Sequence, residues 1–332
     1  MSHLYRISFI ALFALSAIAL PVAAHHSDAG YDHDTVVAFE AKVVRYIFGN
    51  PHVTIFVETE NASGDTEEWE IETGSTPIMT RSGWSADLVS PGDTVRVRAH
   101  PERSGRTRAI LNTMETADGQ LWMQVEVNPE EATVSATSID GVWRGHSEYR
   151  ALQGRNQALT PASEAALAVF DYVRDSPVAD CVAPPPPFLI GTITYLNAIE
   201  VLDDEVILRN EYFDQTRHVY LDGRDHPQNG ERSHVGHSIG SWEGDTLVVD
   251  TVRFADHPSG NGRGIPSGIQ KHMVERYSLN QDGTRVLVDI FVEDPEFLAE
   301  PFVGRTEMIY TPDLELFRYD CDPVLSRQRG FE

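Results

Sequence analysis

Apolar and polar residues alternate along most of this chain, and a period of two is typical of β-strands with one buried face. Residues 52–60 show the pattern clearly, because Val53, Ile55 and Val57 fall on the same face. Residues 91–101 repeat it after a turn. Helical periodicity is rare by comparison. The pattern therefore predicts a mainly β protein.

The first half of the chain predicts a small barrel with one short helix before its fourth strand. Five or six strands in this order are typical of the Greek-key barrel called the OB fold. The label describes topology and implies no nucleic-acid ligand. The expected strands are 35–48, 52–60, 67–73, 91–101, 107–116 and 121–127, and the helix lies within 75–84.

The second half predicts one helix followed by a series of strands. Thr160 is the expected N-cap and Pro161 the first helical residue, and the helix should end before Pro177. Turn sequences then separate strands at hairpin distances, which favours an antiparallel, lipocalin-like β-barrel or a curved sheet. The expected strands are 205–212, 217–223, 245–254, 271–279, 284–294, 304–311 and 315–321.

The N-terminal residues predict a secretory signal peptide over residues 1–24. Arg6 supplies the positive region, a largely apolar stretch follows, and 22–24 are small residues suited to cleavage. The stretch is shorter than the about 20 residues of a membrane span, so we expect no membrane insertion. The expected location is the periplasm or the outside of the cell. The mature protein would comprise an OB-like domain (25–127), a polar linker (128–140) and a barrel-like domain (141–332).

Charge narrows the range of partners. The formal net charge is −25, and such a surface repels phosphate backbones and anionic lipids. Nucleic acid is therefore disfavoured as a partner. A small molecule or a metal ion is compatible with this charge, and the sequence leaves the oligomeric state open.

The chain has two cysteines, Cys181 and Cys321. In an oxidising compartment two such cysteines favour one disulfide. The alternative is a catalytic thiol. Asp320 and Asp322 argue against it for Cys321, because acidic neighbours raise rather than lower a thiol pKa.

Histidines beside the expected cleavage site form a candidate metal site. Cleavage after Ala24 would leave His25 with a free amine, and this amine and its imidazole could chelate one ion together. His26 or His52 would complete a three-nitrogen set, and nitrogen ligands in this geometry suit copper(II). Alternatively, the new terminus is disordered, and His52 merely hydrogen-bonds the N-terminal strand.

A second cluster of candidate residues lies in the predicted strands of the C-terminal domain. On one of these strands His272 and Arg276 share a face, and a face that lined a lumen could bind an anion or catalyse acid–base chemistry. The alternative is a solvated outer face with cross-strand pairs, and for Trp242 a packing role. The candidate pocket residues are Arg217, His226, His237, Trp242, His272, Glu275 and Arg276.

The sequence GHSIG (236–240) matches the letters of a hydrolase nucleophile elbow around Ser238. That elbow requires an apolar strand before the serine and a helix after it. Here a polar segment precedes the motif and a turn and strand follow it. The context therefore disfavours Ser238 as a nucleophile.

Five motifs follow one another in the first part of the chain: AHHSD, NPH (50–52), WEIE (69–72), R-x-G-W (81–84) and PGD-x-V-x-V (91–97). With these motifs, residues 25–127 resemble a family of exported Gram-negative proteins of unknown function.

The second part of the chain contains GVW (141–143), DGR-x-HP (222–227), GHSIG-x-WEGDTLVVDT (236–251), H-x-x-ER (272–276) and a late cysteine. With these motifs, residues 141–332 are similar to a second uncharacterised exported domain. This resemblance implies that Cys181 and Cys321 pair.

These observations favour an exported binding protein with a copper site at its processed terminus and a small-molecule pocket in its second barrel. A hydrolase, lyase or isomerase that uses His237 or His272 is the competing class. A periplasmic scaffold or assembly module is the third.

Overall fold

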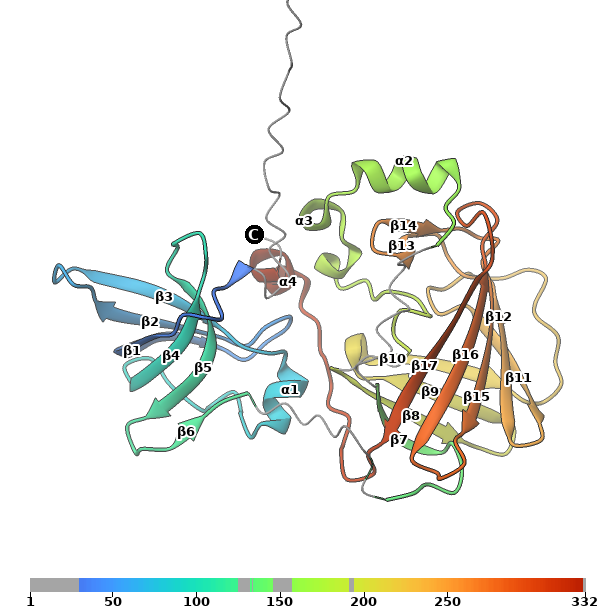
Figure 1. Cartoon of the computed structure of the whole chain (residues 1–332), viewed down its shortest axis with the longest axis horizontal. Coiled ribbons are helices and arrows are strands. Elements are labelled where there is room, and N and C mark those ends of the chain that lie inside the picture. The colour runs from blue at the N-terminus through green and yellow to red at the C-terminus, as the bar shows by residue number, and fades with distance from the viewer. Residues whose placement is uncertain (1–29, 125–131, 133, 146–156, 191–193, 331–332) are drawn as a thin grey trace, which may run out of the picture.

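The computed structural model describes residues 30–124, 132, 134–145, 157–190 and 194–330. It confirms the mainly β class, with two barrels side by side and the end of the chain between them (Figure 1). Within these residues, no helix has the length and apolar character needed to cross a membrane.

The N-terminal barrel is built from β1 (Val37–Ile47), β2 (Thr54–Glu60), β3 (Thr66–Glu72), α1 (Thr76–Arg81), β4 (Thr94–Pro101), β5 (Arg108–Thr116) and β6 (Leu121–Trp122). Its strands follow the order β3-β2-β1-β4-β5-β6, and the barrel closes because β3 also pairs with β5 in parallel. The helix α1 precedes the fourth strand. This connectivity confirms the OB-like topology.

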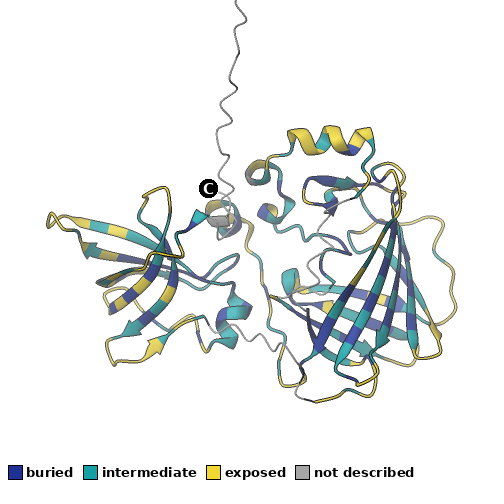
Figure 2. Ribbon diagram, in the orientation of Figure 1, coloured by how far each residue is buried: buried dark blue, intermediate teal, exposed yellow. Residues whose placement is uncertain are grey.

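The interior of the N-terminal barrel is apolar. On β4, Val95, Val97 and Ala99 are buried, while the residues between them are exposed. Met79 of α1 and Trp84 just after it pack on the same core. Figure 2 shows the resulting alternation of buried and exposed residues along the strands. Five strands thus close around a core that side chains fill.

The C-terminal barrel is built from β7 (Gly141–Gly145), β8 (Leu196–Val201), β9 (Glu205–Asn210), β10 (Gln215–Tyr220), β11 (His237–Glu243), β12 (Thr246–Val252), β15 (His272–Leu279), β16 (Arg285–Glu293) and β17 (Phe302–Tyr310). A separate hairpin is formed by β13 (His257–Gly262) and β14 (Ile265–Ser267). The barrel closes in the order β10-β11-β12-β15-β16-β17-β7-β8-β9. Every neighbouring pair is antiparallel except β10 and β11, which pair in parallel. The long connection 221–236 makes this possible, because parallel strands cannot be joined by a tight turn.

The strand predictions differ from the structure at several places, and β7, β8, β13 and β14 were not predicted as strands. β11 was missed, because its sequence HSIGSWE is mostly polar, although Ser238 faces the interior. Residues 315–321 were expected to form a strand and do not. They leave the barrel instead and run toward the N-terminal domain (Figure 1).

The predicted single helix is two helices, α2 (Pro161–Val169) and α3 (Tyr172–Asp175). Thr160 caps α2 as expected, since its side chain accepts a hydrogen bond from Ser163 N at 3.3 Å. Phe170 then adopts an extended conformation, and the side chain of Asp171 caps α3 by accepting from Arg174 N at 2.9 Å. Competition from this second cap ends the first helix. Unpredicted elements are the 3-10 helices η3 (Pro177–Asp180) and η4 (Tyr212–Asp214) and the helix α4 (Pro323–Gly330).

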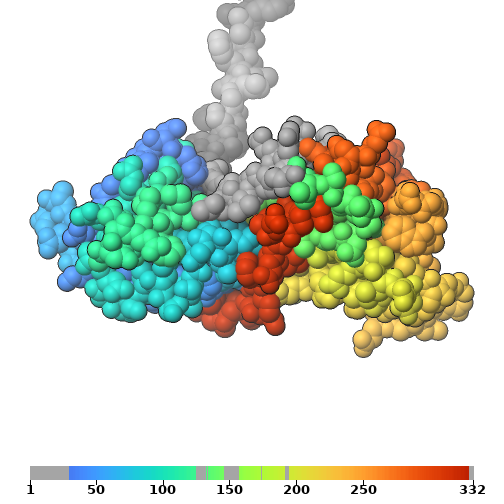
Figure 3. All heavy atoms as spheres, turned by 90° about the horizontal axis from the view of Figure 1, so that it is seen from below, coloured from blue at the N-terminus to red at the C-terminus, as the bar shows by residue number. Residues whose placement is uncertain are grey.

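A C-terminal strap, residues 311–330, connects the two barrels. The disulfide Cys181–Cys321 ties it to the C-terminal domain and confirms the expected pairing. In the NPH motif, Asn50 donates to the carbonyl of Tyr319 in the strap and accepts from Thr76 N at 3.0 Å. Figure 3 shows the strap between the two barrels.

A buried carboxylate joins the same elements. Glu211 is fully buried, accepts from Phe317 N at 2.8 Å and forms an ion pair with Arg81 of α1. Its other oxygen accepts from Leu196 N at 3.3 Å. One carboxylate therefore holds the N-terminal helix, the strap and the C-terminal barrel together.

Candidate functional sites

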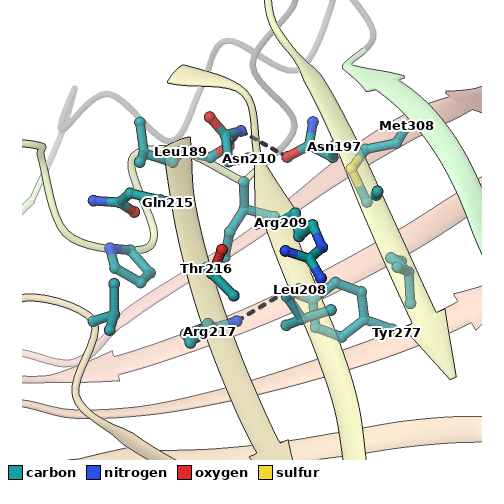
Figure 4. Close-up of a pocket in the computed structure, with 15 residues that line it drawn as sticks. Leu189, Asn197, Leu208, Arg209, Asn210, Gln215, Thr216, Arg217, Tyr277 and Met308 are labelled. Atoms are coloured by element: carbon teal, nitrogen blue, oxygen red, sulfur yellow. Dashed lines mark hydrogen bonds between the residues drawn. The ribbon is translucent and has the colours of Figure 1, made fainter. Parts of the chain in front are cut away.

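A cavity of about 50 Å³ lies between the ends of β8, β9 and β10 in the C-terminal barrel. A buried water needs only about 10–15 Å³, so there is room for a few waters or a small organic group. Figure 4 shows the lining side chains converging from these strands. The residues that line it are Pro186, Leu189, Ile190, Asn197, Ala198, Ile199, Leu208, Arg209, Asn210, Gln215, Thr216, Arg217, Val235, Tyr277 and Met308.

Two buried asparagines form one end of this cavity (Figure 4). The Asn210 amide donates to Leu189 O at 2.9 Å and to Asn197 Oδ1 at 2.8 Å. The Asn210 carbonyl oxygen accepts from Tyr212 N at 2.9 Å. Among the described residues, Nδ2 of Asn197 has no hydrogen-bond partner although it is buried.

Arg217 and Tyr277 line the other end of the cavity, and Arg217 belongs to a buried ion pair. Arg217 donates to both oxygens of Glu275, at 2.6 and 2.8 Å, and the Glu275 side chain is fully buried. Tyr277 donates to Glu275 at 2.6 Å and accepts from Arg217 at 3.3 Å. Burial opposes the charged guanidinium, but the attraction of Glu275 outweighs it and raises the pKa of Arg217. The hydrogen bonds of the pair are therefore closed on themselves inside the barrel.

The other β15 candidates lie outside the barrel, which corrects the expected lumen. Met273, Glu275 and Tyr277 point inward, so His272 and Arg276 point outward. Arg276 pairs with Glu243 at 2.7 Å on this outer face. Arg276 therefore forms a cross-strand pair on the solvated face of the barrel, as the alternative interpretation expected.

Trp242 is 42% exposed, although it shares a face of β11 with Ser238 and lies opposite the buried Leu247 of β12. It belongs to the exposed end of β11 and does not line the cavity. Trp242 therefore lies at the rim of the barrel, outside its buried core. Trp143 and Phe254, by contrast, are fully buried in the core.

Three predicted histidines do come together, around an aspartate that the sequence analysis missed. His226 Nε2 lies 3.0 Å from Asp250, and His272 Nε2 lies 3.1 Å from the same carboxylate. Nδ1 of His226 lies 2.9 Å from Nδ1 of His237. His272 Nδ1 also lies 3.5 Å from Glu293. This chain of contacts is called the histidine relay below.

The relay sets the tautomer of its end member. With His226 Nε2–H donating to Asp250, the other nitrogen of neutral His226 accepts from His237 Nδ1–H. His237 Nε2 is then the unprotonated nitrogen. Burial, and then the neighbouring His226, lower the pKa of His237. Such an arrangement can accept a proton at His237 and stabilise the resulting charge through Asp250.

Ser238 is not a nucleophile elbow in this structure. It lies within β11, is buried, and its hydroxyl bonds Thr251 at 2.8 Å inside the barrel. No helix follows it; the chain continues into β12. The letters of the motif match, and the required geometry does not.

At the N-terminal barrel, His52 has a fixed ring. Its Nδ1 lies 3.0 Å from Thr73 O and 3.0 Å from Glu72. The hydroxyl of Tyr31 reaches the same carboxylate at 3.4 Å, so the start of the described chain lies next to His52. His25 and His26 fall outside the described residues. Within residues 30–330 as described, no group of three or more His, Cys, Asp and Glu side chains is arranged to hold a metal ion.

A further buried group was not anticipated. Lys271 is 1% exposed and donates to the carbonyls of Pro186 and Gly260 at 2.8 and 2.7 Å. Burial lowers its pKa to about 7. His257 is 3% exposed, and burial followed by the charges of His234 and Lys271 lowers its pKa to about 4.

The missed cavity residues had a detectable signal. Val206, Leu208 and Asn210 share the inward face of β9, so Asn210 is a polar residue in an apolar row. Tyr277 likewise follows Met273 and Glu275 on the inward face of β15. A polar residue on the buried face of a strand needs a partner, which marks it as a candidate.

The fold and sites thus describe a two-barrel protein with an internal cavity and an external histidine relay. Residues 14–113 match a family described as a family of unknown function, DUF6152. This match covers β1 to β4 and most of β5 and brings no assigned activity. No curated protein matches the chain.

Proposed function

We propose that this protein is an exported binding protein whose C-terminal barrel takes up a small molecule in the cavity between β8, β9 and β10. The observation that carries the proposal is the cavity lining, which combines apolar side chains with a few fixed polar groups. That combination is typical of small-molecule sites, and barrels of this width can hold one ligand. The disulfide Cys181–Cys321 supports an oxidising compartment.

A thermal-shift screen of small metabolites tests this proposal. A ligand that binds the folded protein raises its melting temperature by mass action. The Leu208→Phe variant, which fills part of the cavity, should lose that shift. Arg276→Ala changes the outer face and should keep it. A ligand whose shift survives Leu208→Phe and disappears in Arg276→Ala would place binding outside the barrel and end the proposal.

A copper(II) site at the processed N-terminus is a second candidate, favoured by the surroundings of His52. Metal-binding histidines usually hydrogen-bond a carbonyl or carboxylate through the ring nitrogen that does not bind the metal. Nδ1 of His52 contacts Thr73 O and Glu72 in this way. Tyr31 contacts the same Glu72. Five or six residues separate Tyr31 from His26 and His25, a span of up to about 20 Å when extended. His25 and His26 can therefore reach His52.

Copper titration tests the second candidate directly. Mature protein that begins at His25 should bind Cu(II) more tightly than the same protein with one extra N-terminal alanine. His52→Ala should weaken binding, and His100→Ala, which removes another histidine of the same barrel, should not. Equal affinity in the two N-terminal forms would exclude a site built on the free amine.

A catalytic alternative rests on the histidine relay. Its one specific support is the unprotonated Nε2 that Asp250 and His226 impose on His237. Activity profiling should then show a turnover that His237→Gln and Asp250→Asn both remove. His218→Gln is the matched control, because His218 is an outer-face histidine paired with Glu205 at 2.9 Å outside the relay. Turnover that persists in both relay variants would reject this alternative.

A further inference from the structure

We propose that the cavity selects uncharged ligands that present a hydrogen-bond acceptor, such as small amides, lactams or ketones, and rejects carboxylates. The inference rests on the proposed function, since it assumes that the cavity binds a small molecule. It reverses the expectation of an anion pocket. Two observations carry it: the cancelled charge of the lining and the spare donor of Asn197.

The charge of the lining is cancelled at both of its guanidinium groups. Arg217 gives two hydrogen bonds to Glu275 and one to Tyr277, so its charge and most of its donors are used inside the barrel. Arg209 gives two bonds to Glu200, at 2.8 and 3.3 Å. No Asp or Glu is among the lining residues. A carboxylate entering this space would lose its hydration without gaining a free cation.

The hydrogen bonds of Asn210 determine which atom of Asn197 is spare. The Asn210 oxygen must accept from Tyr212 N, and the Asn210 amide nitrogen must donate to Leu189 O. The Asn210 amide therefore has one orientation. Its second N–H then requires an oxygen on Asn197. Asn197 therefore turns Oδ1 to Asn210, which leaves Nδ2 as a buried donor without a partner among the described residues.

A buried donor without a partner favours a ligand that accepts a hydrogen bond. Leaving such a group unsatisfied destabilises the empty site, and a ligand carbonyl removes that penalty on binding. Carbonyl oxygens of amides and ketones are neutral acceptors. Asn197 is 7% exposed, so water competes weakly for the donor. Asn197 is thus the specificity-determining residue of the cavity.

Three small probes with the same branched carbon skeleton test the inference on the full-length mature protein: isobutyramide, isobutyrate and isobutylamine. We follow the side-chain amide signals of ¹⁵N-labelled protein during titration. Isobutyramide should shift the Asn197 signal and bind at least about tenfold more tightly than isobutyrate, since only the carboxylate buries a charge without a free cation. Asn197→Leu keeps the volume and should weaken the binding of isobutyramide, because its carbonyl loses the Asn197 donor.

A second variant should reverse the preference between isobutyramide and isobutyrate. Glu275→Gln leaves the Arg217 guanidinium without its carboxylate, so this variant should prefer isobutyrate over isobutyramide. If Asn197→Leu or Glu275→Gln does not fold, Asn197→Ser and the wild-type selectivity decide the question.

The outcomes distinguish the binding of a small molecule in the cavity from the preference of the cavity for uncharged acceptors. Saturable binding of none of the probes would count against the proposed function itself. Isobutyrate or isobutylamine binding as tightly as isobutyramide would leave the pocket in place and overturn its preference for uncharged acceptors. Unchanged isobutyramide binding in a folded Asn197 variant would overturn the role of Asn197.

Discussion

The two barrels of this protein differ in what their interiors contain. The five-stranded closed part of the N-terminal barrel is filled by apolar side chains, and ion pairs such as Arg96–Glu40 lie on its surface. The C-terminal barrel has nine strands, and it encloses Arg217, Glu275 and a cavity. Strand number sets the internal diameter, so the wider barrel has room for a ligand and buried polar groups. The narrow barrel presents its chemistry at the rim, where His52 lies.

The largest expected difference between the barrels concerns their ion pairs. Arg217→Met leaves Glu275 buried without its partner and should lower the free energy of unfolding by about 3–5 kcal/mol. Arg96→Met removes an exposed arginine of the N-terminal barrel and should change it by less than about 1 kcal/mol. Chemical denaturation measures both. The double variant Arg217→Met/Glu275→Leu should recover most of the loss, and equal losses in the two barrels would contradict the comparison.

The disulfide should stabilise the C-terminal barrel and strap. It links residues 140 positions apart, and its removal in Cys181→Ser/Cys321→Ser should cost about 2–5 kcal/mol. Thermal unfolding of wild-type and variant, each with and without reductant, measures the effect. Reductant should lower the melting temperature of the wild type and leave the variant unchanged. A reductant effect of equal size in both would show that another process is involved.

The pH dependence of stability should also come from the C-terminal domain. The folded-state pKa of His257 is about 4, against an ordinary value of 6.5. Between these pH values the unfolded chain binds the proton and the folded chain does not, so stability falls as the pH drops through this window. The loss should approach about 3 kcal/mol. His257→Gln should flatten that part of the curve, whereas an identical decline in both proteins would contradict the assignment.

The smallest expected effect concerns the contact between the barrels. Asn50→Ala removes the bond to Tyr319 O and the contacts with Thr76, and should cost about 1–2 kcal/mol. Asn61→Ala, in a surface turn of the same barrel, is the control and should cost less, although it loses bonds from Ser63 N and Asp65 N. Denaturation followed by tryptophan fluorescence compares them. A greater loss in the control would mean that Asn50 does not join the barrels.

Local patterns in the sequence predicted most of the strands and the class of each barrel. In a strand such as 285–293, the alternation of apolar and polar residues by itself shows which face is buried. The side chain of Thr160 likewise identifies it as a helix cap. The two cysteines likewise predicted their disulfide. The prediction of one continuous helix failed, because the side chain of Asp171 caps a second helix and competes with the helix before it.

The sequence by itself determined where most strands form, because their periodicity and turn residues act over a few neighbouring positions. It did not determine which face of β15 points inward, because both faces carry polar residues and closure of the barrel selects one. Arg217 and Glu275 are 58 positions apart, and the Asn197–Asn210 pair and the histidine relay also join separate segments. Their chemistry arises when distant strands meet in the closed barrel, since burial and charge pairing depend on neighbours in space.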